Sequence, residues 1–273
     1  MSYKTILVHV DGSPHAAARI ALAAQLALRC DAHLVGVAPT GVSRLFYQEG
    51  NAELARTALA PYMDDLYRKT GRDLAHFTEL AEQAGVRSHE QRLVDDETGA
   101  GLALCARYAD LAVLGQADPD LAPAPGGDPV PYVLLACARP LLVVPYIQQG
   151  PLAAKRVLVA WNGSAQAVRA VNAALPLLRL ADQVTVATFG PPQETSGDAE
   201  LVRYLRRHGV NAAQICEPGD PDPGERLLSL LADQGADLLV MGGYGRARLS
   251  ELLLGGVTRT VLQAMTVPVL LAH

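Results

Sequence analysis

Five glycines lie within seventeen residues near the C-terminal end of the sequence, in GGYGRARLSELLLGGVT at 242–258. Glycine lets backbone N–H groups approach an anion closely, and a helix start adds free amides and a favourable dipole. Gly242 and Gly245 flank a turn after an expected strand, while Gly255 and Gly256 precede an expected helix. Together the two glycine groups could hold the phosphates of one ligand.

The spacing of these glycines matches neither of two common phosphate motifs. No Gly-Lys-Ser/Thr follows as in the P-loop, and the dinucleotide motif spaces its glycines differently. The structural alternative is that the first glycine group forms only a tight turn and that the second forms only a break between two helices. Position favours a ligand, because an open α/β sheet binds ligands at the carboxyl ends of its strands. Asn162 lies at another of these ends, where its amide could hold a ribose or an adenine edge.

Other residue types that could do chemistry are dispersed. The four cysteines show no CxxC spacing, and the seven histidines include no HxxxH pair, so we predict no metal site made by protein side chains. In Ala- and Leu-rich surroundings, small buried thiols are the expectation for Cys30, Cys105 and Cys137.

An internal repeat organises the chain. KTILVHVDGSPHAAARIALAAQLA at 4–27 aligns with KRVLVAWNGSAQAVRAVNAALPLL at 155–178, and each copy reads as strand, turn and helix. Ser13 and Ser164 stand at the expected helix N-caps. The repeat continues with ADLAVLG at 109–115, which aligns with ADLLVMG at 236–242.

The repeat predicts an α/β fold with two similar domains, at 1–148 and 152–273, joined by a linker that contains Gly150 and Pro151. Each half contains five short β-rich runs that alternate with helical segments, which is typical of a Rossmann-like parallel sheet covered on both faces. The first half has extra length between Pro39 and Arg87, and we expect a longer helix or lid there.

Composition excludes several classes of partner. The 273 residues carry a net charge of −5 with no basic stripe, so we expect no nucleic-acid binding. The longest apolar runs are far shorter than the ~20 residues of a membrane helix. The opening MSYKTILVHV reads as a strand and leaves no room for a signal peptide, so we expect a cytoplasmic protein that does not associate with membranes.

The spacing Gly242-x2-Gly245-x9-Gly255 resembles the nucleotide-binding signature of the universal stress protein family. The Val-Asp-Gly-Ser at 10–13 and the Val-Pro-Val at 267–269 resemble the ends of the family's first strand and last strand. The likeness covers nearly the whole chain twice, so the chain resembles a tandem universal stress protein with two domains of the adenine nucleotide α-hydrolase-like type.

The resemblance implies an ATP site in the second half, with magnesium bound through the phosphates. Backbone at Gly242, Gly245, Gly255, Gly256 and Val257 would hold the phosphates. The other implied site residues would contact the nucleoside or add charge: Ala160 and Met241 beside the base and sugar, Phe189 at the adenine, Asn162 at the family's acidic position, and Arg246 near the phosphate turn.

Two departures from the signature weaken the implied site. Gly256 replaces the family's Ser or Thr, and Asn162 replaces its acidic residue. Each lost contact is worth ~0.5–1.5 kcal/mol, up to roughly tenfold in affinity. The first half departs further, because prolines interrupt 119–131, where we expect a loop and no working site.

Three functions remain open. The resemblance implies an ATP-binding stress-response regulator. A scaffold with two drifted sites is the second reading. Slow nucleotide hydrolysis is the third and the least supported, because its candidate groups are better explained by turn chemistry at Asp220 and Asp222 and by helix-end charge at His208.

We further expect the two halves to pair as an intramolecular pseudo-dimer through their last strands, at 141–144 and 267–271. Both runs are apolar and need cover. Association of whole chains into a homodimer is left open by the sequence.

Overall fold

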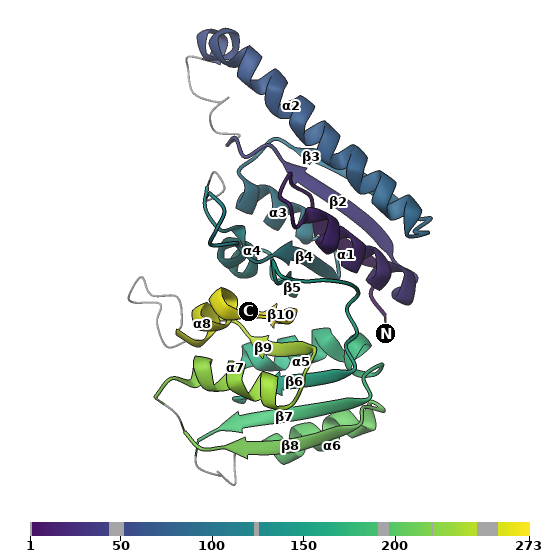
Figure 1. Cartoon of the computed structure of the whole chain (residues 1–273), viewed down its shortest axis with the longest axis vertical. Helices are drawn as coiled ribbons and strands as arrows, with labels where there is room; N and C mark the ends of the chain where they lie inside the picture. The colour runs from purple at the N-terminus through teal and green to yellow at the C-terminus, as the bar shows by residue number, and fades with distance from the viewer. Residues whose placement is uncertain (1, 44–51, 123–125, 191–196, 220, 245–255) are drawn as a thin grey trace. The chain divides into compact units, whose positions relative to one another are not determined.

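The computed structural model describes residues 2–43, 52–122, 126–190, 197–219, 221–244 and 256–273 (Figure 1). Strands and helices alternate along the chain, so the expected α/β class is confirmed. Contacts divide the chain into two compact units. The N-terminal unit contains Tyr3–Arg139 and Gln149–Pro151, and the C-terminal unit contains Pro140–Gln148 and Leu152–His273.

The N-terminal unit contains four parallel strands in the order β3-β2-β1-β4. Their bounds are β1 Thr5–His9, β2 His33–Pro39, β3 His89–Val94 and β4 Leu111–Gly115. The helices of this unit are α1 Ala16–Cys30, α2 Ala52–Gln83, α3 Thr98–Ala106 and α4 Pro129–Ala136.

The C-terminal unit contains the strand order β5-β10-β9-β6-β7-β8. All its neighbouring strands are parallel except β5 and β10, which pair antiparallel. The strands are β5 Leu141–Val144, β6 Arg156–Ala160, β7 Gln183–Phe189, β8 Ala212–Glu217, β9 Leu238–Gly242 and β10 Val269–Ala272. The helices are α5 Ala165–Leu178, α6 Asp198–Arg207, α7 Pro223–Asp233 and α8 Gly256–Ala264.

Strand β5 comes from the first half of the sequence but is part of the C-terminal unit. Its Val143 lies opposite Val269 of β10, and all four of its residues are buried. An apolar four-residue strand needs cover on both faces and a partner at its edge. The last strands of the two halves, which the sequence predicts to associate, thus pair with each other in the structure.

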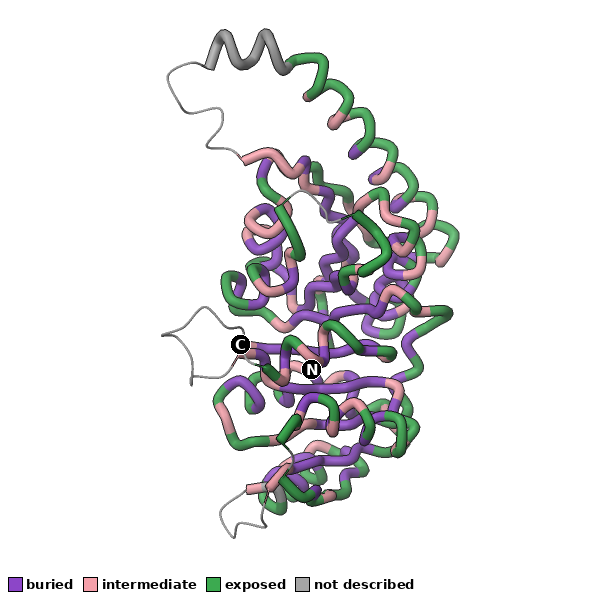
Figure 2. Tube along the Cα trace, turned by 60° about the vertical axis from the view of Figure 1, so that its left-hand side comes forward, coloured by how far each residue is buried: buried purple, intermediate pink, exposed green. Residues whose placement is uncertain are grey.

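The core follows the inner strands, which are buried in Figure 2 along most of their length, whereas most residues of the outer strands β3 and β8 are half-buried or exposed. Consecutive residues of β9, such as Leu238, Leu239 and Val240, are all fully buried. Helices therefore cover both faces of this sheet, as expected for parallel strands. Because parallel strands point the same way, their carboxyl ends lie at one edge of each sheet.

The long helix expected in the first half is confirmed as α2, whose 32 residues span ~48 Å, about twice the length of β2. Phe77 of α2 is fully buried. A Cβ at Gly36 of β2 would lie 2.6 Å from the Phe77 ring, so the glycine admits the ring. None of the helices in the described ranges has the length and apolar character to cross a membrane.

Three local expectations need correction. The loop predicted at 119–131 ends earlier, because α4 begins at Pro129, where a helix tolerates proline. Asp128 caps α4 by accepting a hydrogen bond from Val130 N at 3.0 Å. Ser13 is not a helix cap, because its carbonyl rather than its hydroxyl accepts from Ala16 N. Cys105 is only half-buried, whereas Cys30 and Cys137 are buried as expected.

Candidate functional site

The carboxyl ends of β6, β7 and β9 bring several predicted site residues together in the C-terminal unit. Ala160 lies opposite Met241 on one side and Ala187 on the other. Trp161 N extends this register by donating to Ala187 O at 2.8 Å. Phe189 ends β7 at the same edge. Met241 is buried, whereas Ala160 and Phe189 are half-buried, so their apolar surface could still receive a flat ligand ring.

Asn162 shapes the turn that follows β6. Its Oδ1 accepts a hydrogen bond from Ser164 N at 3.1 Å, across Gly163 with φ of +70°. Ser164 then caps α5 by accepting from Ala167 N at 3.2 Å, as the sequence predicts. The amide of Asn162 therefore has a structural role in this turn, and the residue is otherwise exposed.

Gly242 has a packing role of its own. A Cβ on this residue would lie 2.6 Å from Ala167 N and 2.9 Å from the carbonyl carbon of Gln166. These are backbone atoms of α5, which cannot move aside like a flexible side chain. The first turn of α5 therefore requires glycine at the end of β9 whether or not a ligand binds.

The two described ends of the glycine segment lie next to each other. Tyr244, whose φ is +48°, donates its N–H to Thr258 Oγ1 at 3.3 Å. Thr258 lies in the first turn of α8 and is 4% exposed. Sequence reasoning missed Thr258, although a hydroxyl residue in the first turn of a helix beside a glycine loop was an available signal.

Gly243 has both backbone polar groups engaged within the protein. Its N–H donates to Ala272 O at 2.8 Å, and its carbonyl oxygen lies 3.1 Å from His273 Nδ1. Because the Tyr244 amide is also bonded, the amides just after β9 are committed to protein acceptors. Among described residues, amides for an anion would come from the start of α8.

Helix α8 begins at Gly256 and Val257, two of the predicted phosphate residues. Gly256 is exposed, and a Cβ there would have nothing within 4 Å. The first N–H groups of any helix lack intrahelical acceptors and attract negative charge. The predicted site residues Gly245, Arg246 and Gly255 lie outside the described residues.

A buried hydroxyl at the same edge has no partner among the described residues. Thr188, one residue before Phe189, is 8% exposed, and its Oγ1 makes no hydrogen bond there. The nearby acid Glu217 is instead neutralised by Arg226, whose Nε donates to Glu217 Oε2 at 3.1 Å. The ends of β7 and β8 therefore offer the neutral Thr188 hydroxyl, while the carboxylate of Glu217 is paired.

The residues considered for hydrolysis have structural partners. Asp222 caps α7 by accepting from Gly224 N and Glu225 N, each at 3.1 Å. His208 ends α6, and its Nδ1 lies 3.0 Å from Arg179 Nη2. Asp220 lies outside the described residues. No group of three or more His, Cys, Asp or Glu side chains in the described ranges is arranged to hold a metal ion.

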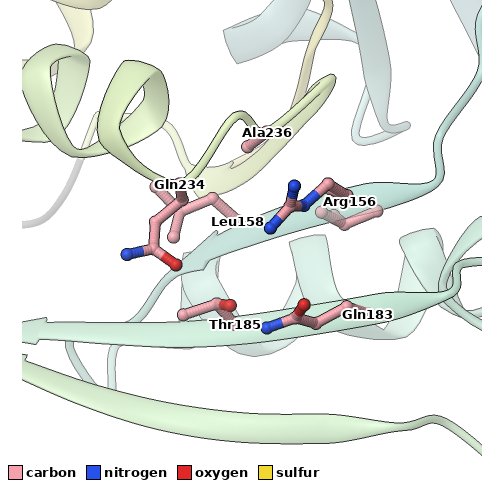
Figure 3. Close-up of a pocket in the computed structure, with 7 residues that line it drawn as sticks. Arg156, Leu158, Gln183, Thr185, Gln234 and Ala236 are labelled. Carbon is pink, nitrogen blue, oxygen red and sulfur yellow. The ribbon is translucent and has the colours of Figure 1, made fainter.

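A small open pocket lies at the opposite ends of the same strands (Figure 3). Its cavity volume is about 10 Å³, roughly the space of one water molecule, so the pocket is far too small for a nucleotide. Its lining contains none of the predicted site residues and consists of Arg156, Val157, Leu158, Gln183, Thr185, Gln234 and Ala236.

Comparison with known proteins places the C-terminal region in a family. Residues 153–273 match the model of the Universal stress protein family. A universal stress protein of Methanocaldococcus jannaschii is 40% identical over 48 residues, which are 18% of this chain and 30% of that protein. One of Mycobacterium tuberculosis is 28% identical over 140 residues, covering 44% of this chain and 96% of that protein.

Solved structures extend the likeness in fold to the whole chain. A universal stress protein from Archaeoglobus fulgidus superposes with a TM-score of 0.76 at 16% identity, covering 98% of this chain and 95% of that one. A functionally unknown protein from Pseudomonas aeruginosa superposes with a TM-score of 0.59 at 18% identity, covering 99% and 92%. The C-terminal region therefore matches the Universal stress protein family, and the α/β fold of these structures extends over almost the full length of the chain.

Proposed function

We propose that this chain is a tandem universal stress protein that binds ATP or another adenine nucleotide in its second domain, residues 152–273. It would act as a stress-response regulator whose loaded and empty forms differ in stability and in partner choice. The first domain, residues 1–148, would serve as a scaffold without a nucleotide. A cytoplasmic location belongs to the same proposal.

One observation carries the proposal. Tyr244 N donates to Thr258 Oγ1, so the end of β9 and the start of α8 lie together although fourteen residues separate them. The family-type glycine spacing spans this closed segment. Both described ends of this segment therefore lie at the carboxyl edge of the sheet, which is where parallel α/β sheets bind ligands.

The described residues fit an adenine nucleotide in three respects. The start of α8 supplies amides to an anion, and the bare Gly256 leaves space beside them. Ala160 and Phe189 provide apolar surface for a base, with the buried Met241 paired beside Ala160. The buried Thr188 hydroxyl, unpartnered among the described residues, could hydrogen-bond the nucleoside. A bound nucleotide would bring its phosphate charge, with magnesium held by those phosphates.

The second candidate function is an interaction scaffold without a nucleotide. The turns after β6 and β9 favour it. Asn162 Oδ1 is engaged by Ser164 N, and the amides of Gly243 and Tyr244 donate to protein oxygens. These groups would contribute little to a ligand. Affinity then depends on the start of α8 and on the residues between it and Tyr244.

Calorimetric titration with ATP tests the proposal. We expect the parent chain to bind one ATP, and the double variant Gly245→Asp with Gly255→Val to bind none, because side chains at these positions would block backbone approach to phosphate. The matched control is Gly71→Asp, which introduces the same aspartate on exposed α2, where a Cβ would meet nothing within 4 Å. It should bind like the parent.

Thermal melting in the presence of ATP provides a second readout. A ligand that binds only the folded state stabilises it by about 2.7 kcal/mol at a hundred times its Kd. The melting temperature should rise with ATP in the parent and in Gly71→Asp, but not in the double variant. If the parent shows neither heat nor a melting shift up to millimolar ATP, the nucleotide proposal is wrong and the scaffold reading replaces it.

A further inference from the structure

A buried ion pair lies at the carboxyl edge of the N-terminal unit. Arg19 of α1 is 3% exposed. Its Nη2 lies 2.9 Å from Asp11 Oδ1, and its Nε donates to His9 O at 2.9 Å. A Cβ at Gly115 would lie 2.5 Å from Arg19 Nη1, so the guanidinium packs against the end of β4. The cation thus connects the ends of β1 and β4 from inside the protein.

A second contact connects the loops that follow the same two strands. His15, at the start of α1, places its Nε2 2.7 Å from Asp118 Oδ2 in the segment after β4. Asp118 Oδ1 accepts from Asp120 N at 2.9 Å. The Asp118 side chain is 11% exposed, so its carboxylate is largely covered by these neighbours.

The internal repeat shows that these residues change together. When 4–27 is aligned with 155–178, and the alignment of 109–115 with 236–242 is continued by three residues, each member has an uncharged counterpart in the second half: Asp11 with Asn162, His15 with Gln166, Arg19 with Ala170, and Asp118 with Gly245. Ala170 is fully buried, so its position has no room for an arginine. The second glycine of the phosphate signature is thus a carboxylate in the first half.

We infer that the Asp11–Arg19 and His15–Asp118 contacts close the carboxyl edge of the N-terminal unit against anionic ligands, so that the chain takes a single nucleotide. Only the second part of this inference, that the chain takes a single nucleotide, rests on the proposed function. A phosphate approaching this edge would meet the carboxylates of Asp11 and Asp118. The nearest buried cation is already paired and, with its side chain 4% exposed, is out of reach.

A further acid strengthens this exclusion. Asp73 of α2 lies over the turn after β1, because a Cβ at Gly12 would be 3.3 Å from Asp73 Oδ2. Partial burial raises the pKa of Asp73, and the nearby Asp11 raises it further although Lys69 opposes the change. The carboxylates of Asp11 and Asp73 therefore meet at this turn from two elements, with Lys69 beside them.

Binding stoichiometry tests the exclusion, with ATP as the probe in calorimetry on the full chain. We expect one site in the parent and none in Gly245→Asp, which gives the second half the residue type found at 118. Arg19→Ala should keep one site with affinity within about twofold of the parent, since a paired, buried side chain contributes no ligand contact. Loss of binding in a folded Arg19→Ala chain would overturn the inference while leaving the proposed function standing. Two sites in the parent would overturn the inference and the scaffold role of the first domain, but not nucleotide binding in the second.

Stability tests the closing contact even if the parent binds no ATP. Asp11→Asn and Arg19→Ala should each lower the melting temperature by roughly 5–15 °C, because each leaves a charge without its partner. The double variant recreates the Asn–Ala combination of the second half and should lose clearly less than the sum of the two. The control Asn162→Asp, at an exposed site, should leave the melting temperature almost unchanged. Additive losses would show that the two residues act independently and would overturn the inference.

Discussion

Single residues at the strand ends have different roles in the two halves, although the repeat gives them similar surroundings. Asp11 and Asn162 both accept a hydrogen bond from the serine two residues later. Only Asp11 also faces a buried arginine. Burial alone would raise the pKa of Asp11, but Arg19 and His9 hold it below its usual range. The carboxylate is therefore needed where the cation is present, and an amide suffices where it is absent.

His9 should make the protein less stable in mild acid. Burial lowers the pKa of His9 to about 4, although Asp11 opposes the shift. The unfolded chain takes up the proton near pH 6.5, whereas the folded protein takes it up only near pH 4. Stability is therefore unaffected above pH 6.5 and falls as the pH drops from 6.5 towards 4.

Denaturant titrations can isolate this contribution. From pH 7.5 to pH 5, His9 should account for a loss of about 2 kcal/mol in unfolding free energy. The variant His9→Gln retains the backbone carbonyl that accepts from Arg19. Its unfolding free energy should fall by about 2 kcal/mol less than that of the parent over the same pH range. Equal pH dependence in the parent and the variant would mean that His9 is charged in the folded protein at pH 5.

At the scale of elements, the close approach of α5 restricts which residue can stand at the end of β9. Gly242→Ala should destabilise the fold by about 1–3 kcal/mol, since its Cβ would meet the α5 backbone at 2.6 Å. Gly256→Ala is the matched control, because it adds the same methyl group into open space. Urea unfolding should separate the two variants, and equal stabilities would contradict the packing role of Gly242.

The elements themselves could largely be predicted, because apolar runs and the repeat locate the strands and the extra length indicates α2. The helix start at Pro129 was missed, since proline usually signals a break and its tolerance at a first turn depends on the cap at Asp128. Arg19 was missed for a different reason. Arginine is normally exposed, and only the matched exchange of Asp11 with Asn162 and Arg19 with Ala170 marks it in the sequence.

At the scale of the whole molecule, the β5–β10 pair is the feature that local patterns specify least. The sequence indicates that both strands need cover but cannot give their register, which depends on segments far apart in the chain. The antiparallel pairing of Val143 with Val269 supports the proposed association of the two halves through their last strands.

Val269→Lys tests that pairing. Val269 is fully buried, so an unpaired ammonium there should lower the unfolding free energy by about 3–5 kcal/mol. Val168 of α5 is 41% exposed, so Val168→Lys should change the unfolding free energy by less than about 0.5 kcal/mol. Calorimetric melting of both variants compares the two sites. An unchanged melting profile for Val269→Lys would contradict the buried β5–β10 pair.

The order in which these strands are synthesised has a consequence for the cell. Strand β10 is made about 125 residues after β5, so at ~5–20 residues per second β5 waits roughly 6–25 s for its partner. During that interval the run Leu141–Val144 is an unpaired, wholly apolar strand edge. The growing chain would then expose this edge to aggregation for that interval, and slower translation would lengthen the exposure.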